Sequence, residues 1–318
     1  MVLTTARPPD ASIPRTRPAA RRRTAWRENI SGYVFLSPWL LGFVTIVAGP
    51  ILVSLYLSFT RYSVLRSPKW TGLDNYRRML TQDPTFWSAL EVTLTYLVLS
   101  VPVVQVFALF LASMLNRGVR GSTVYRAIFY LPSLIGGSVA IAILWRYLFE
   151  GDGLLNNALG AIGISTQQSW IGSPDTALGT LIVLNVWQFG ASMIIYLAGL
   201  RQVPAELYES AAIDGAGTFR RFRSITLPLL SPVIFFNVLM NVVTAFQAFN
   251  TAYIVSNGTG GPADSTLFYT LYLYQRGFVD FDMGYASALG WGLLVLVAAS
   301  AAGLFALSRR LVFYGDQR

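Results

Sequence analysis

The side chains of this sequence that could do chemistry are uncharged and lie inside long apolar segments. They are Asn185 and Gln188 in the segment 177–200, and Asn241, Gln247, Asn250 and Tyr253 in the segment 232–255. Amides offer paired donors and acceptors to hydroxyl groups, and aromatic faces cover apolar C–H surface. These residue types therefore predict binding of a neutral, hydroxyl-rich solute, without covalent catalysis.

The same side chains have a second interpretation, which the sequence leaves open. Polar groups are costly in a membrane, so amides also form hydrogen bonds between helices, each worth about 0.6–2 kcal/mol. No Asp, Glu, Lys or Arg lies in the middle of an apolar segment, which disfavours an ion or proton site. The chain has no Cys and no His, which excludes thiol nucleophiles, imidazole bases and most zinc sites.

The elements that must position these residues are long apolar helices. Of the 318 residues, 54% are hydrophobic and only 12% are charged, whereas a soluble domain usually has about 25% charged residues. A helix of about 20 apolar residues crosses the ~30 Å hydrocarbon core. The sequence therefore predicts an all-α membrane protein with about six transmembrane helices. The expected spans are 32–59, 92–115, 127–145, 177–200, 232–255 and 283–307.

The arginines predict the orientation. With the N-terminus inside, the inside segments hold 17 of the 24 Lys and Arg residues and the outside segments hold 7. Positive charge favours the cytoplasmic side, so both termini are expected in the cytoplasm, with residues 1–31 as a disordered basic tail. The outer loop 60–91, with five basic residues, departs from this pattern. The net charge of +9 is thereby attributed to membrane topology and not to nucleic acid.

One outer segment, 267–278, places apolar residues on a single helical face. Leu267, Leu271, Tyr274 and Phe278 share this face. We expect a helix that lies on the membrane surface or docks a partner, and the sequence does not choose between the two.

The loop 201–224, between the fourth and fifth spans, is expected on the cytoplasmic side. Pro204 suits the first turn of a helix, and Glu206 and Glu209 suit its positive end. Gly215 can end that helix in a left-handed conformation. The predicted helix–turn–helix either packs on its own membrane domain or binds a partner.

This loop carries a recognisable motif. The run from Glu209 to Ala216 (ESAAIDGA), followed by Leu227-Pro228, resembles the EAA motif of ABC-type importer permeases, with Ser210 in place of an alanine. The wider sequence resembles the sugar-permease branch, the MalF/UgpA-like transmembrane subunits. Further matching residues are Gly72-Leu73-Asp74-Asn75-Tyr76, Leu131-Pro132, Gly260-Gly261-Pro262 and Ala286-Ser287-Ala288.

The resemblance implies the type I ABC importer fold and a pore subunit of a carbohydrate importer in the bacterial plasma membrane. Its partners would be a second homologous permease, two ATPase subunits and an extracytoplasmic solute-binding protein. The ATPase-coupling residues implied by the motif are Glu209, Ser210, Ala211, Asp214 and Gly215. ATP and Mg would bind the ATPase subunits, and this chain would bind no cofactor and catalyse no reaction.

One observation from the residues agrees with that division of labour. The single lysine, Lys69, is not part of a phosphate-binding loop, so any ATP hydrolysis must occur on another subunit. The alternative is an ion-coupled secondary transporter of a small polar solute, which would need charged residues in mid-membrane or an inverted repeat.

Overall fold

The computed structural model describes residues 32–118, 120–164 and 166–313, so the predicted basic tail, 1–31, lies outside the described residues. The chain divides into two units, Met1–Ser54 and Leu55–Arg318. The elements in chain order are η1 (Phe43–Ala48), α2 (Gly49–Ser58), β1 (Thr60–Ser63), β2 (Arg66–Trp70), α3 (Asp74–Thr81), α4 (Pro84–Asn116), α5 (Ser122–Ile135), α6 (Val139–Phe149), α7 (Leu154–Ala161), α8 (Pro174–Trp187), α9 (Gly190–Leu200), α10 (Ala205–Ile213), α11 (Thr218–Arg221), η2 (Phe222–Thr226), α12 (Leu227–Phe246), α13 (Asn250–Val255), η3 (Pro262–Asp264), α14 (Tyr269–Tyr274), η4 (Gln275–Val279) and α15 (Met283–Leu311).

The first unit contains most of one apolar helix. Helical structure runs over Gly32–Ser58, long and apolar enough to cross a membrane. Before Pro50 the helix widens into the π-helical stretch η1, and the N–H of Gly49 donates to the carbonyl of Val44. Proline has no N–H and its ring crowds the preceding turn, which explains the altered bonding just before it.

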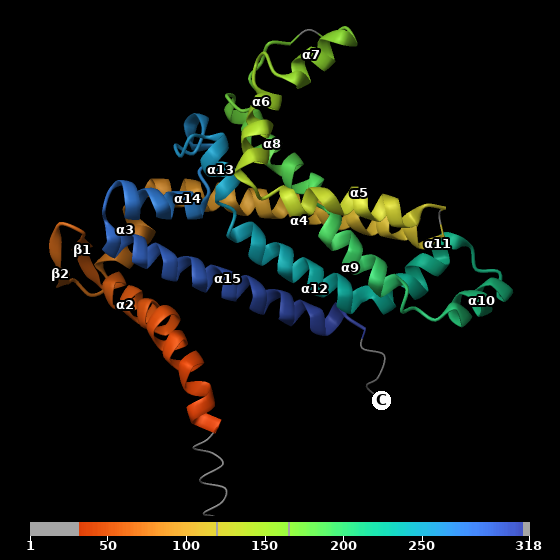
Figure 1. Ribbon diagram of the computed structural model, residues 1–318, viewed down its shortest axis with the longest axis horizontal. Helices are drawn as coiled ribbons and strands as arrows, with labels where there is room; N and C mark the ends of the chain where they lie inside the picture. Colours follow the sequence, from red (N-terminus) through yellow and green to blue (C-terminus); the bar gives the residue numbers. More distant parts are fainter. Residues whose placement is uncertain (1–31, 119, 165, 314–318) are drawn as a thin grey trace, which may run out of the picture. The chain divides into compact units, whose positions relative to one another are not determined.

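The second unit is built around α4. This helix packs against α8, α9 and α12, and α12 packs in turn on α15, as Figure 1 shows. Pro84 occupies the first turn and the carboxylate of Asp83 caps it by accepting from the N–H of Phe86 at 3.2 Å. The helix therefore begins eight residues before the expected span 92–115. It contributes to both apolar cores, with Phe86 in one and Val104 in the other.

Several expected spans are interrupted. Among the described residues, four helices are long and apolar enough to span a membrane, and the count rises to six if two bent helix pairs each form one span. The expected span 127–145 is instead α5 and α6, which meet at 96°. Pro132, Gly136 and Gly137 lie at this bend, and Ser138 caps α6 by accepting from the N–H of Ile141.

Two further breaks are milder. The expected span 177–200 is divided into α8 and α9, which meet at 41°. The expected span 232–255 starts earlier, at Leu227, and is divided between α12, which ends at Phe246, and α13, which begins at Asn250.

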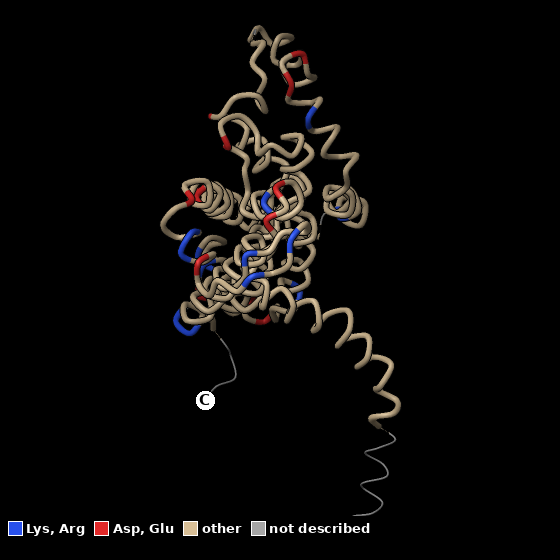
Figure 2. Tube along the Cα trace, turned by 90° about the vertical axis from the view of Figure 1, so that its left-hand side faces the viewer, with Lys and Arg blue, Asp and Glu red and all other residues tan. Residues whose placement is uncertain are grey.

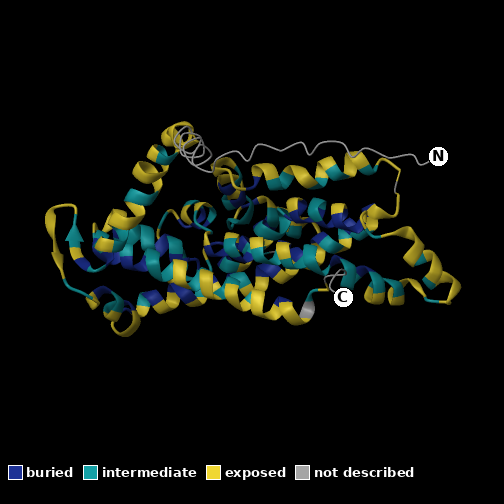
Figure 3. Cartoon of the chain, turned by 90° about the horizontal axis from the view of Figure 1, so that it is seen from below, coloured by how far each residue is buried: buried dark blue, intermediate teal, exposed yellow. Residues whose placement is uncertain are grey.

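The outward faces of the long helices are apolar. On α4 the exposed side chains include Val98 and Phe110, and on α15 they include Val295 and Phe305. Figure 3 shows exposed residues along these helices, with buried residues between the helices. A soluble monomer rarely exposes so much contiguous apolar surface, so these faces suit contact with lipid.

The second unit has two polar ends. In Figure 1, α10 and α11 lie at one end of the long helices, and the hairpin β1–β2 with α3 lies at the other. Acidic and basic residues gather at the hairpin end, which faces the viewer in Figure 2. The two ends are thus separated by the apolar length of α4, α12 and α15.

The expectation of a surface helix at 267–278 is wrong for two of its four residues. Leu267 and Leu271 are 2% and 0% exposed and belong to the main apolar core. The N–H of Tyr269 donates to Thr93 on α4 at 2.9 Å, which holds the start of α14 against that helix. Phe278 remains exposed. The apolar face therefore packs mainly inside the protein.

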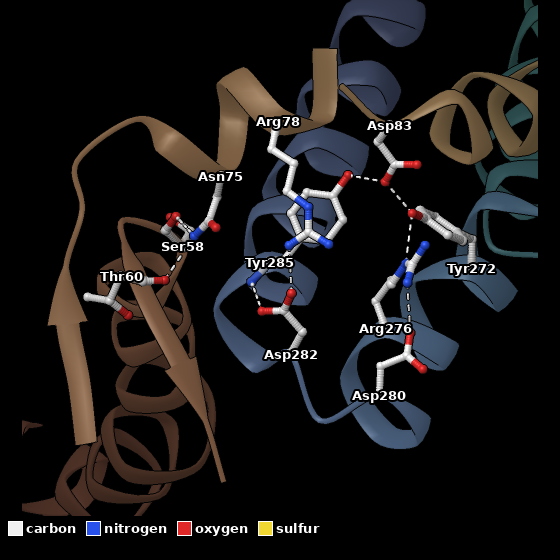
Figure 4. Close-up of polar contacts among 10 residues, drawn as sticks. All are labelled: Ser58, Thr60, Asn75, Arg78, Asp83, Tyr272, Arg276, Asp280, Asp282 and Tyr285. Carbon is white, nitrogen blue, oxygen red and sulfur yellow. Dashed lines mark hydrogen bonds and ion pairs between the residues drawn. The ribbon is translucent and has the colours of Figure 1, made fainter. Parts of the chain in front are cut away.

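A buried carboxylate joins three segments at the hairpin end. Asp83, 7% exposed, accepts hydrogen bonds from the hydroxyls of Tyr272 on α14 and Tyr285 on α15 (Figure 4). The Nε of Arg276 donates to the Tyr272 hydroxyl at 2.8 Å. Burial alone would raise the pKa of Asp83, but the two tyrosines, the N–H of Phe86 and the charge of Arg276 hold that pKa below its ordinary value.

An ion pair and further hydrogen bonds lie beside this network. Arg78 on α3 pairs with Asp282 at 2.7 Å and lies over the ring of Tyr285 at 4.1 Å. Next to it, the side-chain amide of Asn75 donates to the carbonyls of Ser58 and Thr60, both at 2.9 Å (Figure 4). The loop before α4 is thereby fixed to α14 and to the start of α15.

Replacing Asp83 by Ala should lower the stability of the protein in detergent by about 3 kcal/mol at pH 7, because a helix cap is lost and two tyrosine hydroxyls lose their acceptor. The lowered pKa means that the ionised carboxylate stabilises the fold above about pH 4, and that this contribution is lost as the pH falls through the lowered value. Thermal unfolding of both proteins across pH should therefore show a difference that shrinks on acidification.

The control is Asp74→Ala. Asp74 is exposed in the first turn of α3, so its loss should change stability little. Equal melting temperatures for Asp83→Ala and Asp74→Ala at pH 7 would contradict the structural role of Asp83.

Candidate functional site

The loop 201–224 forms the predicted helix–turn–helix. α10 begins after Pro204, with Glu206 in its first turn, and α11 follows after Gly217. Tyr208 and Ala211 are half-buried and face the membrane domain, whereas Glu209, Ser210 and Asp214 are exposed. The motif residues thus lie mostly on the outward side of α10.

Gly215 ends α10 in the left-handed conformation that its sequence position predicts. Its φ is +75°, its N–H donates to the carbonyl of Ala212 at 3.1 Å, and the N–H of Ala216 donates to the carbonyl of Ala211 at 2.8 Å. This pair of bonds is the Schellman motif. The helix end is therefore confirmed, and the reversal of the chain depends on a residue without a Cβ.

Among the residues that the structure describes, one side-chain hydrogen bond attaches α10 to the segment just before α12. The hydroxyls of Tyr208 and Thr226 lie 2.8 Å apart. Away from this contact the loop exposes large apolar side chains, with Ile213 88% and Phe219 75% exposed. Because these residues lie beyond the apolar length of the long helices, their exposure indicates a surface for a protein partner.

The amides of the fourth span lie at its break. Gln188 caps α8, and its side-chain amide donates to the carbonyl of Leu184 at 3.2 Å. A Cβ at Gly136 would overlap the Gln188 side chain, so the breaks of the third and fourth spans meet at this glutamine. Asn185 is half-buried. Its backbone carbonyl accepts a hydrogen bond from the backbone N–H of Gln188 at 3.1 Å.

Asn241 joins two helices. Its amide donates to the hydroxyl of Ser192 on α9 at 3.1 Å and to the carbonyl of Asn237 at 2.9 Å. The bond to Ser192 joins α12 to α9, as the second interpretation of these amides predicts, whereas the bond to Asn237 lies within α12. Its carbonyl oxygen accepts no hydrogen bond from a described residue, so it can still accept one from a solute.

The other two amides flank the break of the fifth span. Gln247 caps α12 and Asn250 opens α13, and both are exposed. The hydroxyl of Thr270 donates to the carbonyl of Ala248, one of the carbonyls that the break releases from helical bonding. Among the described residues, no side-chain hydrogen bond links the six sequence-predicted residues to one another. Gln188, Gln247 and Asn250 lie at helix breaks, whereas Asn241 lies inside α12 and Tyr253 inside α13.

Tyr253 belongs to an aromatic cluster that the sequence predicted only in part. Phe249 stacks on Tyr253 at 5.4 Å, Tyr274 contacts both rings edge-on or tilted, and Phe278 stacks on Tyr274 at 5.2 Å. Tyr253 and Phe278 are the more exposed members. Four rings from two segments thus form a platform of the kind that covers apolar sugar faces.

Tyr253 also lines a cavity of about 630 Å³ with charged residues that the sequence did not single out. Arg146 on α6 pairs with Glu150 at 3.4 Å and donates to the side-chain oxygen of Asn257. The signal available was the spacing of Arg146 and Glu150, which are four residues apart. Both residues lie just beyond the expected third span, 127–145, so the sequence predicts them in an outer loop and gives no reason to single them out.

The chain matches, over residues 105–315, the family of binding-protein-dependent transport system inner membrane components. The match covers more than half of the chain, and the chain therefore belongs to this family of membrane transport permeases. The predicted family is confirmed, and the chain is a multi-pass membrane protein.

Relatives extend the match to nearly the whole chain. The protein named "Probable ABC transporter permease protein YesP" of Bacillus subtilis (strain 168) is 49% identical over 92% of this chain and 95% of its own length. The "Lactose transport system permease protein LacF" of Rhizobium radiobacter is 36% identical over 85% of this chain and 91% of its own length.

A solved structure confirms the fold. A chain of the bacterial alginate ABC transporter, crystallised with its alginate pentasaccharide-bound periplasmic protein, superposes with a TM-score of 0.76. It is 24% identical, and the superposition covers 90% of this chain and 96% of that one. The predicted all-α architecture of type I ABC importer permeases is thereby confirmed.

The aromatic cluster predicts that Tyr253 covers the solute, so replacing Tyr253 by Ala should raise the KM for transport by about tenfold in the assembled transporter. The measurement is the concentration dependence of ATP-driven uptake by vesicles that contain the variant.

Two controls separate stacking from other effects. Tyr253→Phe keeps the ring and should retain most of the affinity. Tyr125→Ala removes an exposed tyrosine from α5, outside the aromatic cluster, and should leave KM unchanged. An unchanged KM in Tyr253→Ala would remove this residue from the solute path.

Proposed function

We propose that this chain is one of two pore-forming permeases of an ATP-driven importer for a carbohydrate. A solute-binding protein delivers the solute at the hairpin end, and two ATPase subunits bind at the end that carries α10. The observation that carries the proposal is α10, an exposed helix that bears the motif. Among the described residues, α10 is held by the turn at Gly215 and by one hydroxyl contact, between Tyr208 and Thr226. Family membership supports the proposal. The name of the relative LacF, a lactose transport system permease protein, supports a carbohydrate as the solute.

The ATPase partner follows from the division of chemistry. This chain has no phosphate-binding loop around its single lysine, so the nucleotide and its Mg bind elsewhere. Ile213 and Phe219 offer apolar anchors for a partner groove, and Glu209 and Asp214 lie exposed on the same short helix–turn–helix. In this proposal Glu209, Ser210, Ala211, Asp214 and Gly215 form the joint through which ATPase closure moves the membrane helices.

The orientation is part of the same proposal. The loop 201–224 lies in the cytoplasm with both termini, and the hairpin end faces the outside. Figure 1 supports this assignment because α10 and the hairpin lie at opposite ends of the long helices.

The carbohydrate is assigned from the helix breaks. Asn250 and Gln247 are exposed amides beside the aromatic platform, and no described residue donates to the side-chain oxygen of Asn241. Amides with flat rings match neutral, hydroxyl-rich solutes. Broken helices near mid-membrane are also where transporters place their solute sites, because unwound backbone is tolerated only where it lines a cavity or is buried in protein.

Reconstitution tests the proposal against ion-coupled transport. Vesicles that contain both permeases, the ATPase subunits and the cognate binding protein should accumulate labelled oligosaccharide only with ATP inside the compartment that holds the ATPase. Vesicles with this chain alone should not accumulate it under a proton or sodium gradient. Gradient-driven uptake by the chain alone would instead establish a secondary transporter.

Gly215→Pro should uncouple the ATPase from transport. Proline fixes φ near −65° and has no N–H, so it can satisfy neither the φ of +75° nor the bond to Ala212. We expect membrane insertion to persist and uptake per ATP hydrolysed to fall by about tenfold or more. A loss of ~1.4 kcal/mol in the coupling free energy is enough for a tenfold fall.

The matched control is Gly217→Pro. Gly217 has a φ of −67°, close to the value that proline requires, and its N–H donates to no described acceptor. This variant should couple normally. Normal coupling in Gly215→Pro, or equal loss in both variants, would contradict the proposed joint.

A further inference from the structure

A second cavity lies behind α10, at the same end of the molecule. It has a volume of about 610 Å³ and opens between the C-terminal ends of α4 and α9 and the loop formed by α10 and α11. Its lining includes Arg117, Arg221, Leu200, Tyr208, Phe219 and Phe222. The candidate solute path lies elsewhere, at the helix breaks, and the proposed transport cycle leaves this cavity without a role.

The polar part of the cavity is positively charged. Arg117 and Arg221 both line it, and no Asp or Glu is among its described lining residues. Neither arginine takes part in the three ion pairs of the described chain. The Nε of Arg221 is buried and has no hydrogen-bond acceptor among the residues that the structure describes. A desolvated guanidinium nitrogen without an acceptor is costly, so an anion is expected here.

The apolar part of the site continues onto the outer face of α4. Phe110, Met114 and Arg117 are spaced four and three residues apart, so they share one face of the chain around the end of this helix. Phe110 and Met114 are exposed, 58% and 47%, on a helix long enough to cross a membrane. A stripe that faces lipid therefore ends at an arginine of the cavity.

We infer that this cavity binds the headgroup of an anionic phospholipid, with its phosphate between Arg117 and Arg221. The acyl chains would lie along Met114 and Phe110, and Phe222 would cover the glycerol region. Arginine suits this role because its planar fork matches phosphate oxygens. An acidic peptide would satisfy the arginines but not the apolar stripe that runs toward the bilayer.

The bound lipid would also touch the coupling loop, since Tyr208 of α10 lines the same cavity. Any influence of the lipid on coupling rests on the proposed function. The binding itself rests only on the chain being a membrane protein, so a binding measurement tests it independently of transport.

The test uses the full chain in detergent, freed of lipid, with phosphatidylglycerol, phosphatidylcholine and inorganic phosphate as probes in native mass spectrometry. Wild-type protein should retain phosphatidylglycerol in preference to phosphatidylcholine. Arg117→Gln with Arg221→Gln should weaken phosphatidylglycerol binding by about fivefold for each arginine. The matched control, Arg220→Gln with Arg223→Gln, removes the same charge from exposed residues of the same segment that do not line the cavity, and should bind as wild type.

Arg117 is exposed, so Arg117→Gln alone keeps the test available if the double variant does not fold. Equal weakening by the control pair would assign the effect to diffuse surface charge and overturn the site. No weakening by Arg117→Gln and the double variant, or equal binding of phosphatidylcholine, would overturn it as well. Displacement of the lipid by inorganic phosphate would assign the cavity to the free anion and not to lipid.

Discussion

The whole structure is governed by one constraint: hydrocarbon cannot form hydrogen bonds, so each backbone N–H and C=O in a span must find its partner within the protein. The long helices meet this requirement without side chains. Where they break, nearby groups replace the lost bonds: Ser138 caps α6, the side chain of Gln188 reaches the carbonyl of Leu184, and Thr270 donates to the carbonyl of Ala248. Some of the polar residues inside the apolar segments therefore lie where the helices are interrupted, and others, such as Asn237 and Asn241, lie within α12.

This constraint explains why structural and solute-binding interpretations of the amides are not exclusive. An amide that bonds to helix backbone or to a neighbouring helix uses some of its four hydrogen-bonding positions and leaves others. Asn241 uses its two donors on Ser192 and Asn237, while its oxygen stays available within the described structure. Such a residue supports the packing of the helices and still has an acceptor to offer to a solute.

The limits of sequence reasoning follow from the same physics. The spans and the left-handed end at Gly215 were predictable, because length, apolarity and a helix-ending glycine are local signals. The 96° bend between α5 and α6 was not, since Pro132 and Gly136 permit a bend without setting its angle, and the contact of Gly136 with Gln188 joins distant segments. The burial of Leu271 and the cavity beside Arg146 also depend on which helices pack together.

The two candidate regions are joined by one element. α11, η2 and α12 run from the turn after Gly215 to the break at Gln247 without leaving helical structure. The 20 residues of α12 alone span about 30 Å. Just before the first residue of α12, Thr226 contacts Tyr208 of α10. Further along α12, Asn241 is bonded to Ser192 on α9. In the proposed cycle a displacement of α10 would therefore reach the break beside the aromatic platform through one continuous helical segment.

Only a helix that packs closely in two positions can transmit such motion, because packed interfaces shift between discrete arrangements and do not deform continuously. The small residues that allow α9 to approach its neighbours, Gly190 against α5 and Gly199 against α12, are the places where a second arrangement would have to fit.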